Sequence, residues 1–515
     1  MKSAPRCILR ASKHVSYCKM PGPFRTCDLE QPFLLPPSLQ DWLPEGHLAR
    51  FIAEVSEQLN LSGIYTCYER RDGRGAEGYH PLMLTRLLLY AYCVGKPSSR
   101  QIEKATHDEV AFRYLAADQH PDHDTIASFR QRHVASLSGL FEQALRMCQK
   151  AGLVKLGHIA LDGTKIWAQA SRRKNVSGQQ VAEQEKELAA RVAQLMAEAE
   201  RVDGEEDARY GKEKRGDELP AELATSAKRL EKLRELKAQM EQQAREQATQ
   251  LAREQGEAGG KPRNEAEKKR WQRAKKRTEL DQQRVNESDT DSRLMKDGSS
   301  GAFVQAYNAQ AAVDDQQQII VAAEVTQACN DKEQLGPMVE QIKQNVEATP
   351  EAITADAGYF SEKALSSEVL NGIDVLVPPD AQRPRGPEQE LAPNAPRGPQ
   401  AEAMRERLKQ TAGRTMYSRR QATVEPVFGQ IKERRRFRRF SLRGLEKVRG
   451  EWLLICLTHN LLKLYRHQRT ITEGEPIQQG APNGAKNSKQ TAKIGPIRRC
   501  RPHSFRSAIR RIKTA

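Results

Sequence analysis

The chain of 515 residues carries 84 lysines and arginines against 67 aspartates and glutamates, which gives a net charge of +17 and a pI near 9.4. This basic excess favours nucleic acid or an anionic membrane as the partner, yet no apolar run approaches the ~18 residues that would span a bilayer. Nine scattered cysteines, none of them in a Cys-x-x-Cys pair, argue against a disulfide framework or a zinc knuckle and are typical of reduced thiols in a cytoplasm.

The first region that we expect to fold is helical and spans residues 31–150, after a basic, unpatterned extension over residues 1–30 that shows no secretory signal. Met20 offers a second possible start, so we expect the first nineteen residues to be dispensable. Pro36-Pro37 and Ser38 predict a first helix, and Ser98 with Gln101 predicts a capping box for a later one. Several short helices in a row are typical of a helix-turn-helix DNA reader and equally of a plain helical bundle.

The stretch HIALDGTKI, residues 158–166, predicts the first strand. Ile159 and Leu161 alternate with Asp162, so the aspartate projects to the opposite face from the two aliphatic side chains. An aspartate inside a strand runs against β propensity, and functional residues are often found at such violations. An ordinary turn at Asp162-Gly163 is the alternative.

A second strand-rich region begins near Ala302 and follows a charged insertion. Residues 177–287 are rich in Glu, Lys, Gln, Ala and Arg and predict an antiparallel helical hairpin or short coiled coil, which would serve as a dimer contact, a DNA-facing arm or a plain exposed insertion. Two strands then precede a helix capped by Asn330 and Glu333, a short strand ending at Asp356, and a further strand, IDVLVPP. These elements predict a mixed α/β domain over residues 155–467, with a mobile loop at 378–400 and a disordered basic tail at 468–515.

The stretch Tyr417–Arg443, YSRRQATVEPVFGQIKERRRFRRFSLR, places an acid beside a run of arginines. Glu425 stands before an apolar helical turn, and Lys432 follows seven residues later on the same face of an ideal helix. Pro426 disfavours helical geometry at the preceding residue, so we expect Glu425 at a helix cap. Phe437 and Phe440 interrupt the arginines and either pack against a helix or stack on an unpaired base. The basic side chains predicted to grip phosphates are Lys432, Arg434, Arg435, Arg436, Arg438 and Arg439.

Asp162, Asp356 and Glu425 stand out among the acids by their context. Neighbouring parallel strands can bring the two aspartates together, with a helix delivering the glutamate. Carboxylates crowded at one place repel each other unless a cation holds them, and Mg²⁺ prefers a few carboxylates together with water and phosphate oxygens. Two such ions about 4 Å apart would serve an in-line displacement at phosphorus. Asp289, Asp291 and Asp374 are weaker candidates.

The sequence resembles the DDE transposases of bacterial insertion sequences, which have an RNase H-like catalytic domain. The resemblance rests on LDGTK at Asp162, ITADAGY at Asp356 and YSRRQATVEPVFGQIK from Tyr417 to Lys432, and extends less sharply over SDTDSRLM and YNAQAAVD. It implies that Asp162, Asp356 and Glu425 are the catalytic, metal-binding triad, and that Tyr417 and Arg420 contact DNA ends. Tyr417 and Arg420 lie one residue farther from Glu425 than the family pattern has them.

The resemblance also implies the activity: an enzyme that binds the terminal inverted repeats of its element and performs strand cleavage and strand transfer with two Mg²⁺ ions, which Mn²⁺ can replace. Its partners would be double-stranded DNA, at the element ends and the target, and a second copy of the chain, because two ends must be paired. No membrane is implied, and the expected location is the bacterial cytoplasm at the nucleoid. The alternatives are a non-catalytic DNA-binding protein, decayed or repurposed, and an RNase H-like nuclease without joining activity.

Overall fold

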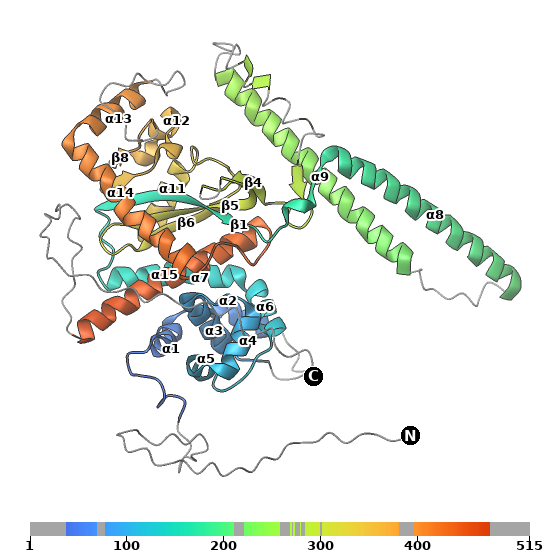
Figure 1. Ribbon diagram of the computed structural model, residues 1–515, viewed down its shortest axis with the longest axis horizontal. Coiled ribbons are helices and arrows are strands. Elements are labelled where there is room, and N and C mark those ends of the chain that lie inside the picture. The colour runs from blue at the N-terminus through green and yellow to red at the C-terminus, as the bar shows by residue number, and fades with distance from the viewer. Residues whose placement is uncertain are drawn as a thin grey trace, which may run out of the picture. The chain divides into compact units, whose positions relative to one another are not determined.

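The structure is a computed structural model (Figure 1) that describes residues 38–69, 78–210, 221–257, 284–298, 301–380 and 398–473, together with positions 268, 269, 271, 272, 275, 279 and 396. The predicted extension over residues 1–30 lies outside this part of the chain. The predicted loop at 378–400 and the tail beyond 468 lie mostly outside it.

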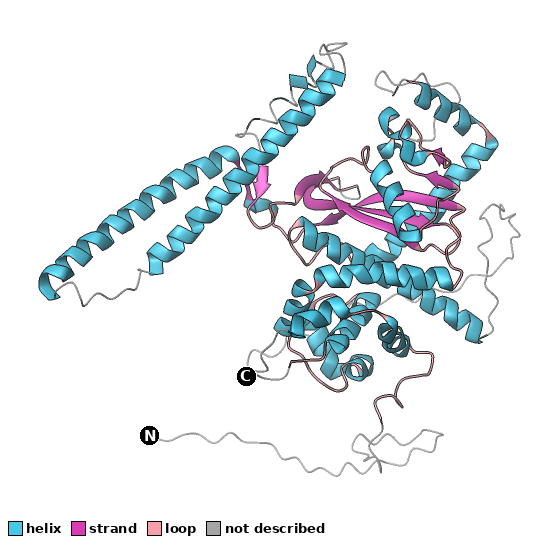
Figure 2. Ribbon diagram, turned by 180° about the vertical axis from the view of Figure 1, so that it is seen from behind, coloured by secondary structure: helices cyan, strands magenta, loops and turns pink. Residues whose placement is uncertain are grey.

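A mixed sheet is the centre of the fold, and its strands lie close to where the sequence predicts them. The strands β1 (His158–Trp167), β5 (Phe303–Asp314) and β6 (Ile320–Thr326) form an antiparallel set in which β5 pairs with both others. β7 (Ala352–Thr354) and β8 (Asp374–Leu376) continue the sheet in parallel beyond β1, and β4 (Arg293–Lys296) pairs with the start of β5. The order is therefore β4-β5-β1-β7-β8, with β6 also on β5. Figure 2 draws the strands in magenta.

Helices surround this sheet and share one apolar core with it. The long helix α15 (Leu445–Glu473) joins the two parts: the indole of Trp452 donates to Gln310 O of β5 (2.9 Å), and Glu451 accepts from the hydroxyl of Tyr92 (3.4 Å). Figure 1 shows α15 and α7 between the sheet and the other N-terminal helices. The apolar cluster accordingly runs from Leu43 to Leu464 without a break between helices and sheet. The N-terminal helices are α1 (Leu48–Gln58), α2 (Ser62–Glu69), α3 (Pro81–Val94), α4 (Ser99–Asp108), α5 (Val110–Leu115), α6 (His123–Arg132) and α7 (Val134–Lys150).

Between β1 and β5 the chain forms two long helices, α8 (Gly178–Tyr210) and α9 (Ala221–Glu257), which lie side by side in both ribbon views (Figures 1 and 2). A two-stranded antiparallel ribbon of β2 (Asn175–Ser177) and β3 (Arg284–Asn286) stands at their base. Val181, Leu233, Leu236 and Met240 form a small apolar cluster with this ribbon, separate from the main core.

Three local predictions about helix ends were wrong. Residues 38–43 form turns where we expected a helix after Pro36-Pro37, and the helix α11 (Leu335–Val346) begins after Gln334, not at an Asn330 cap. Ser98 does precede α4, but its side chain makes no capping hydrogen bond. None of the described helices is long and apolar enough to cross a membrane.

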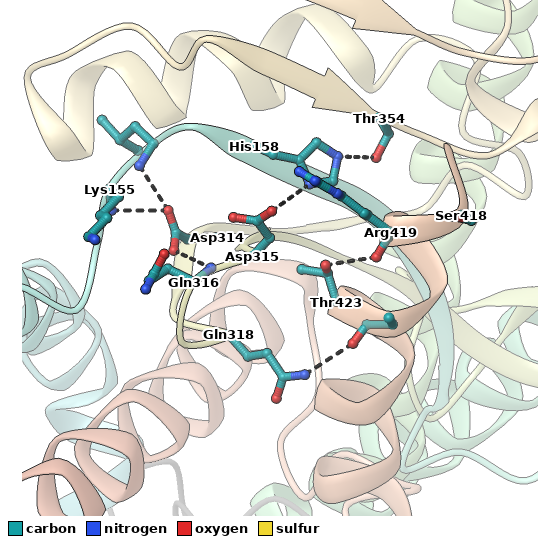
Figure 3. Close-up of polar contacts among 12 residues, drawn as sticks. Lys155, His158, Asp314, Asp315, Gln316, Gln318, Thr354, Ser418, Arg419 and Thr423 are labelled. Atoms are coloured by element: carbon teal, nitrogen blue, oxygen red, sulfur yellow. Dashed lines mark hydrogen bonds and ion pairs between the residues drawn. The ribbon is translucent and has the colours of Figure 1, made fainter. Parts of the chain in front are cut away.

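Glu425 lies inside the helix α14 (Thr411–Gly429), which corrects the predicted position at a cap. Pro426 is accommodated within that helix. A proline removes the hydrogen bond to the carbonyl four residues earlier, here Ala422 O. The side chain of Gln318, in the β5–β6 connection, donates to that carbonyl at 3.1 Å and so replaces the missing donor (Figure 3).

The start of β1 is fixed by polar contacts from two neighbouring strands (Figure 3). Asp314, at the end of β5, accepts from the backbone N–H groups of Lys155 and Leu156 at 3.2 and 2.9 Å. His158 contacts Thr354 of β7 at 2.9 Å and Asp315 at 3.3 Å. The pairing of β1 with β5 and β7 sets the register of β1, and that register positions the first predicted aspartate.

Candidate active site

The parallel pairing of β1 with β7 brings two of the predicted acids together. Ala160 of β1 pairs with Thr354 of β7 in the last pair of this ladder, so Asp162 and Asp356 each lie two residues beyond it, Asp162 within β1 and Asp356 just after β7. Asp162 Oδ1 accepts from the backbone N–H of Gly163 at 2.9 Å, and Asp356 Oδ1 accepts from that of Gly358 at 2.9 Å. Both carboxylates are thus anchored by the backbone at the carboxyl edge of the sheet.

Arg420 occupies the space beside these acids. Its Nη1 lies 3.2 Å from Asp162 Oδ2, the side chains are 9% and 19% exposed, and the guanidinium lies 5.6 Å from the ring centre of Tyr417. Arg420 Nε is buried without a hydrogen-bond partner among the described residues. The sequence predicted Tyr417 and Arg420 as contacts to DNA; in this structure both lie at the acids, with Arg420 as the counter-ion of Asp162.

The site has the electrostatics of crowded carboxylates. Burial raises the pKa of Asp162 to about 6; Arg420 opposes the rise, and Asp356 and Asp331 add to it. Burial also raises the pKa of Asp356, with Arg420 opposing and Asp331 adding to the shift. Burial alone would lower the pKa of Arg420, but the charges of Asp162, Tyr417 and Asp356 raise it. Acids grouped in this way favour a bound cation, because ionising each carboxylate without one is costly.

Asp331 acts electrostatically on both Asp162 and Asp356, although no sequence motif indicated it. It lies between β6 and α11, and its Oδ1 accepts from Asn308 Nδ2 and Gln310 Nε2 of β5, both at 2.6 Å. The signal available in the sequence was the set of amides in β5, where Gln305, Asn308 and Gln310 are all buried, since buried amides need a partner.

Glu425, the third predicted acid, lies on the exposed side of α14, whereas Arg420, Thr423, Val424 and Val427 form the buried side. A π-helical turn, η5 (Gln430–Arg434), follows α14 and breaks the ideal spacing from Glu425 to Lys432. Lys432 is half-buried, and burial, together with the charge of Arg438, lowers its pKa, while the charges of Asp297, Glu433 and Asp162 act in the opposite direction.

The arginine segment alternates between the surface and the interior. Arg435 is buried and donates to Ile455 O and Thr458 Oγ1 of α15, so it is a structural residue and not the phosphate contact that we predicted. Phe437 and Phe440 are buried, as the helix-packing alternative expected. A left-handed backbone at Arg436 (φ 63°) separates Arg435 from Phe437 and leaves the Arg436 side chain exposed. The exposed members are Arg434, Arg436, Arg438 and Arg439.

This arginine segment is hydrogen-bonded to Trp167, the last residue of β1. The N–H of Trp167 donates to Arg438 O at 3.0 Å, and Trp167 O accepts from the N–H of Phe440 at 2.8 Å. The guanidinium of Arg439 lies 5.5 Å from the ring centre of Trp167. Arg438 forms an ion pair with Glu433.

The donor set fits a hard divalent cation. Asp162 and Asp356 supply half-buried carboxylate oxygens, and oxygen is the ligand that Mg²⁺ prefers. Among the described residues, however, no three His, Cys, Asp or Glu side chains are already grouped to hold an ion. Arg420 neutralises Asp162 in this arrangement, and an ion at Asp162 would take over that role.

A mixed α/β fold with two acids just beyond the paired residues of two adjacent parallel strands, followed by an acid-bearing helix, is consistent with an RNase H-like DDE domain. Residues 281–461 match a family described as transposase DDE domain, and residues 37–132 match a family described as transposase domain (DUF772). Neither the curated proteins nor the solved structures gave a match. The two family matches identify the chain as a DDE-type transposase of insertion sequences. Proteins of these families act on DNA, and DDE transposases generally use divalent metal ions.

Proposed function

We propose that this transposase binds the terminal inverted repeats of its element and catalyses Mg²⁺-dependent cleavage and joining of DNA strands, with Asp162 and Asp356 as metal-binding carboxylates. The observation that carries the proposal is the β1–β7 register, which brings these two acids together beside Arg420. Glu425 remains in the proposal as the third acid that the family resemblance implies. Its side chain is exposed on α14.

A basic groove beyond the site supports DNA as the substrate. It is lined by the cations Arg172, Lys174, Arg439 and Arg443 and by the rings of Trp167 and Phe303, and none of the described residues lining it is acidic. Trp167 stands five residues along β1 from Asp162, which is about 17 Å of strand. That length matches about five nucleotides of a B-form strand. We propose that a DNA backbone runs from the acids into this groove.

The residues divide the chemistry among them. Bound ions would activate water or a 3′-hydroxyl and stabilise the departing oxygen. Lys432, which directly precedes the arginines in the sequence, would hold a phosphate next to the scissile one. The exposed arginines 434, 436, 438 and 439 neutralise backbone phosphates farther along. Arg420 would leave Asp162 when an ion binds there, and its guanidinium would then be available for DNA.

The test uses duplexes that carry the inverted repeats bordering the coding region, with purified full-length protein and Mg²⁺ or Mn²⁺. Wild type is expected to nick beside the repeats and to join the 3′ ends to a target. Asp162→Asn should keep end binding and lose both reactions, because the isosteric amide removes one negative ligand. Asp315→Asn is the matched control, since Asp315 is a half-buried acid that contacts His158 at the other end of β1.

Three results would contradict the proposal. Cleavage by Asp162→Asn at the wild-type rate would remove Asp162 from the site. End binding by wild type without nicking in either metal would indicate a non-catalytic DNA-binding protein. Cutting that ignores pairing of ends and never joins them would indicate a nuclease of the RNase H type.

A further inference from the structure

We propose that Asp331 is a metal-binding carboxylate of this site and shares a divalent ion with Asp356. The inference rests on the proposed function and adds a ligand that neither the sequence motifs nor the family matches assign. Asp331 comes from the connection between β6 and α11, outside the three motifs that carry the family resemblance.

The position of Asp331 beside Asp356 is the first argument. A Cβ atom placed on Gly358 would lie 2.9 Å from Asp356 Oδ1 and 3.4 Å from Asp331 Oδ2. Both oxygens therefore lie within 3.4 Å of one point, and their separation is less than twice that distance. Asp331 and Asp356 are both half-buried, and two neighbouring carboxylates in such surroundings repel each other unless a cation lies between them.

The way Asp331 is held is the second argument. Its Oδ1 is engaged by two amide donors from β5, Asn308 Nδ2 and Gln310 Nε2, and Gln310 Oε1 in turn accepts from the hydroxyl of Tyr359. Tyr359 is fully buried in the segment that follows Asp356. This chain of hydrogen bonds fixes the carboxylate through Oδ1 and leaves Oδ2 on the side of Asp356. Partners of this kind orient the ligands of metal sites in proteins.

An unpartnered oxygen beside Asp331 is an independent observation that points to a ligand. Asn308 is fully buried, and its Oδ1 has no hydrogen-bond partner among the described residues. The amide orientation is set by its other end, because Nδ2 contacts two acceptors, Ala328 O and Asp331 Oδ1. A buried acceptor without a hydrogen-bond partner destabilises the fold, so an acceptor of this kind next to a carboxylate indicates a cation or a bound donor there.

Gly163 provides the space that this arrangement needs. A Cβ atom at Gly163 would lie 2.5 Å from Gln310 Nε2, 2.8 Å from Asp331 Oδ1 and 3.0 Å from Asn308 Oδ1. A side chain at this position would push all three groups away. The absence of a side chain at Gly163 therefore leaves room for the Asp331 carboxylate and the unpartnered Asn308 Oδ1 next to β1.

The test measures Mn²⁺ binding to the full-length protein without DNA, by isothermal titration calorimetry and electron paramagnetic resonance. Asp331→Asn keeps an oxygen for the two amide donors and replaces Oδ2 by an NH₂ group. It should weaken Mn²⁺ binding at least tenfold, on the scale of losses around metal sites. Asp331→Glu should bind more tightly than Asp331→Asn, and Asp315→Asn should bind as wild type does.

Metal-directed cleavage of the wild-type protein provides a second test that does not depend on the folding of Asp331→Asn. Fe²⁺ bound at the site, with ascorbate and peroxide, cuts the protein backbone nearby. We expect cuts near residues 331 and 356. Cuts near 356 but none near 331, or wild-type Mn²⁺ affinity in folded Asp331→Asn, would overturn the role of Asp331 and leave the proposed function intact. Wild-type affinity in Asp162→Asn and Asp356→Asn as well would show instead that the proposed metal site itself is wrong.

Discussion

Replacing Asp162 by asparagine should make the metal-free protein more stable at neutral pH. The amide has the shape of the protonated carboxyl group and carries no charge. In the wild-type chain, burial raises the pKa of Asp162 to about 6 from its ordinary 3.8, so the folded state holds this proton more tightly than the unfolded chain does. The ionised carboxylate therefore destabilises the folded state, and replacing it by a neutral group should stabilise the protein, as is common for substitutions in active sites.

The magnitude follows from the size of the shift. Each pKa unit is worth about 1.4 kcal/mol, so a shift of roughly two units destabilises the ionised form by about 3 kcal/mol. Because the folded pKa is the higher one, wild type loses stability as pH rises from about 4 to about 6, and the loss then stays constant. The variant lacks this loss, so it should match wild type near pH 4 and exceed it by about 3 kcal/mol at pH 7.5.

The assay is urea unfolding followed by tryptophan fluorescence, with the fully buried Trp452 as the probe, at pH 4 and pH 7.5. Mn²⁺ added at a hundred times its dissociation constant should stabilise wild type by about 2.7 kcal/mol and the variant much less. A variant that is less stable than wild type at pH 7.5, or a difference that does not change with pH, would refute the electrostatic account of the site.

Two further predictions concern the segment around α14. The Gln318→Ala substitution should cost about 1 kcal/mol in wild type and much less in a Pro426→Ala background, because alanine restores the helical donor to Ala422 O; equal costs in both backgrounds would contradict this. Arg435→Ala should lower the free energy of unfolding by roughly 2 kcal/mol and leave the salt dependence of DNA binding unchanged, whereas the exposed neighbour Arg436→Ala should leave stability unchanged and reduce the slope of log K against log salt by about 0.9. Urea unfolding and binding isotherms at several salt concentrations separate the two arginines, and the opposite assignment would overturn the burial pattern.

The strands were predictable because their signals are local. The stretch FVQAYNAQAAVD, predicted as a strand, is β5 from its first residue to its last, and the strand predicted around Asp162 is β1. The proximity of Asp162 and Asp356 was predictable because two neighbouring parallel strands bring residues at matching positions side by side. The register of β1 against β7 meets that expectation.

The rest depended on tertiary contacts that no local pattern encodes. Asp331 is an acid in a polar loop, and only the two amides of β5 distinguish it from other loop acids. Arg435 belongs to an arginine run that looks uniformly exposed, but the positive φ at Arg436 turns its neighbour into the core. Pro426 suggested a helix end, because its replacement donor, Gln318, comes from a distant turn.

The most direct test of the central claim is the anomalous scattering of Mn²⁺ in crystals of the full-length protein. We expect a strong anomalous peak between the carboxylates of Asp162 and Asp356, with the guanidinium of Arg420 displaced from Asp162. A protein that holds Mn²⁺ only at other positions, with the Arg420–Asp162 ion pair intact, would contradict the account of this site.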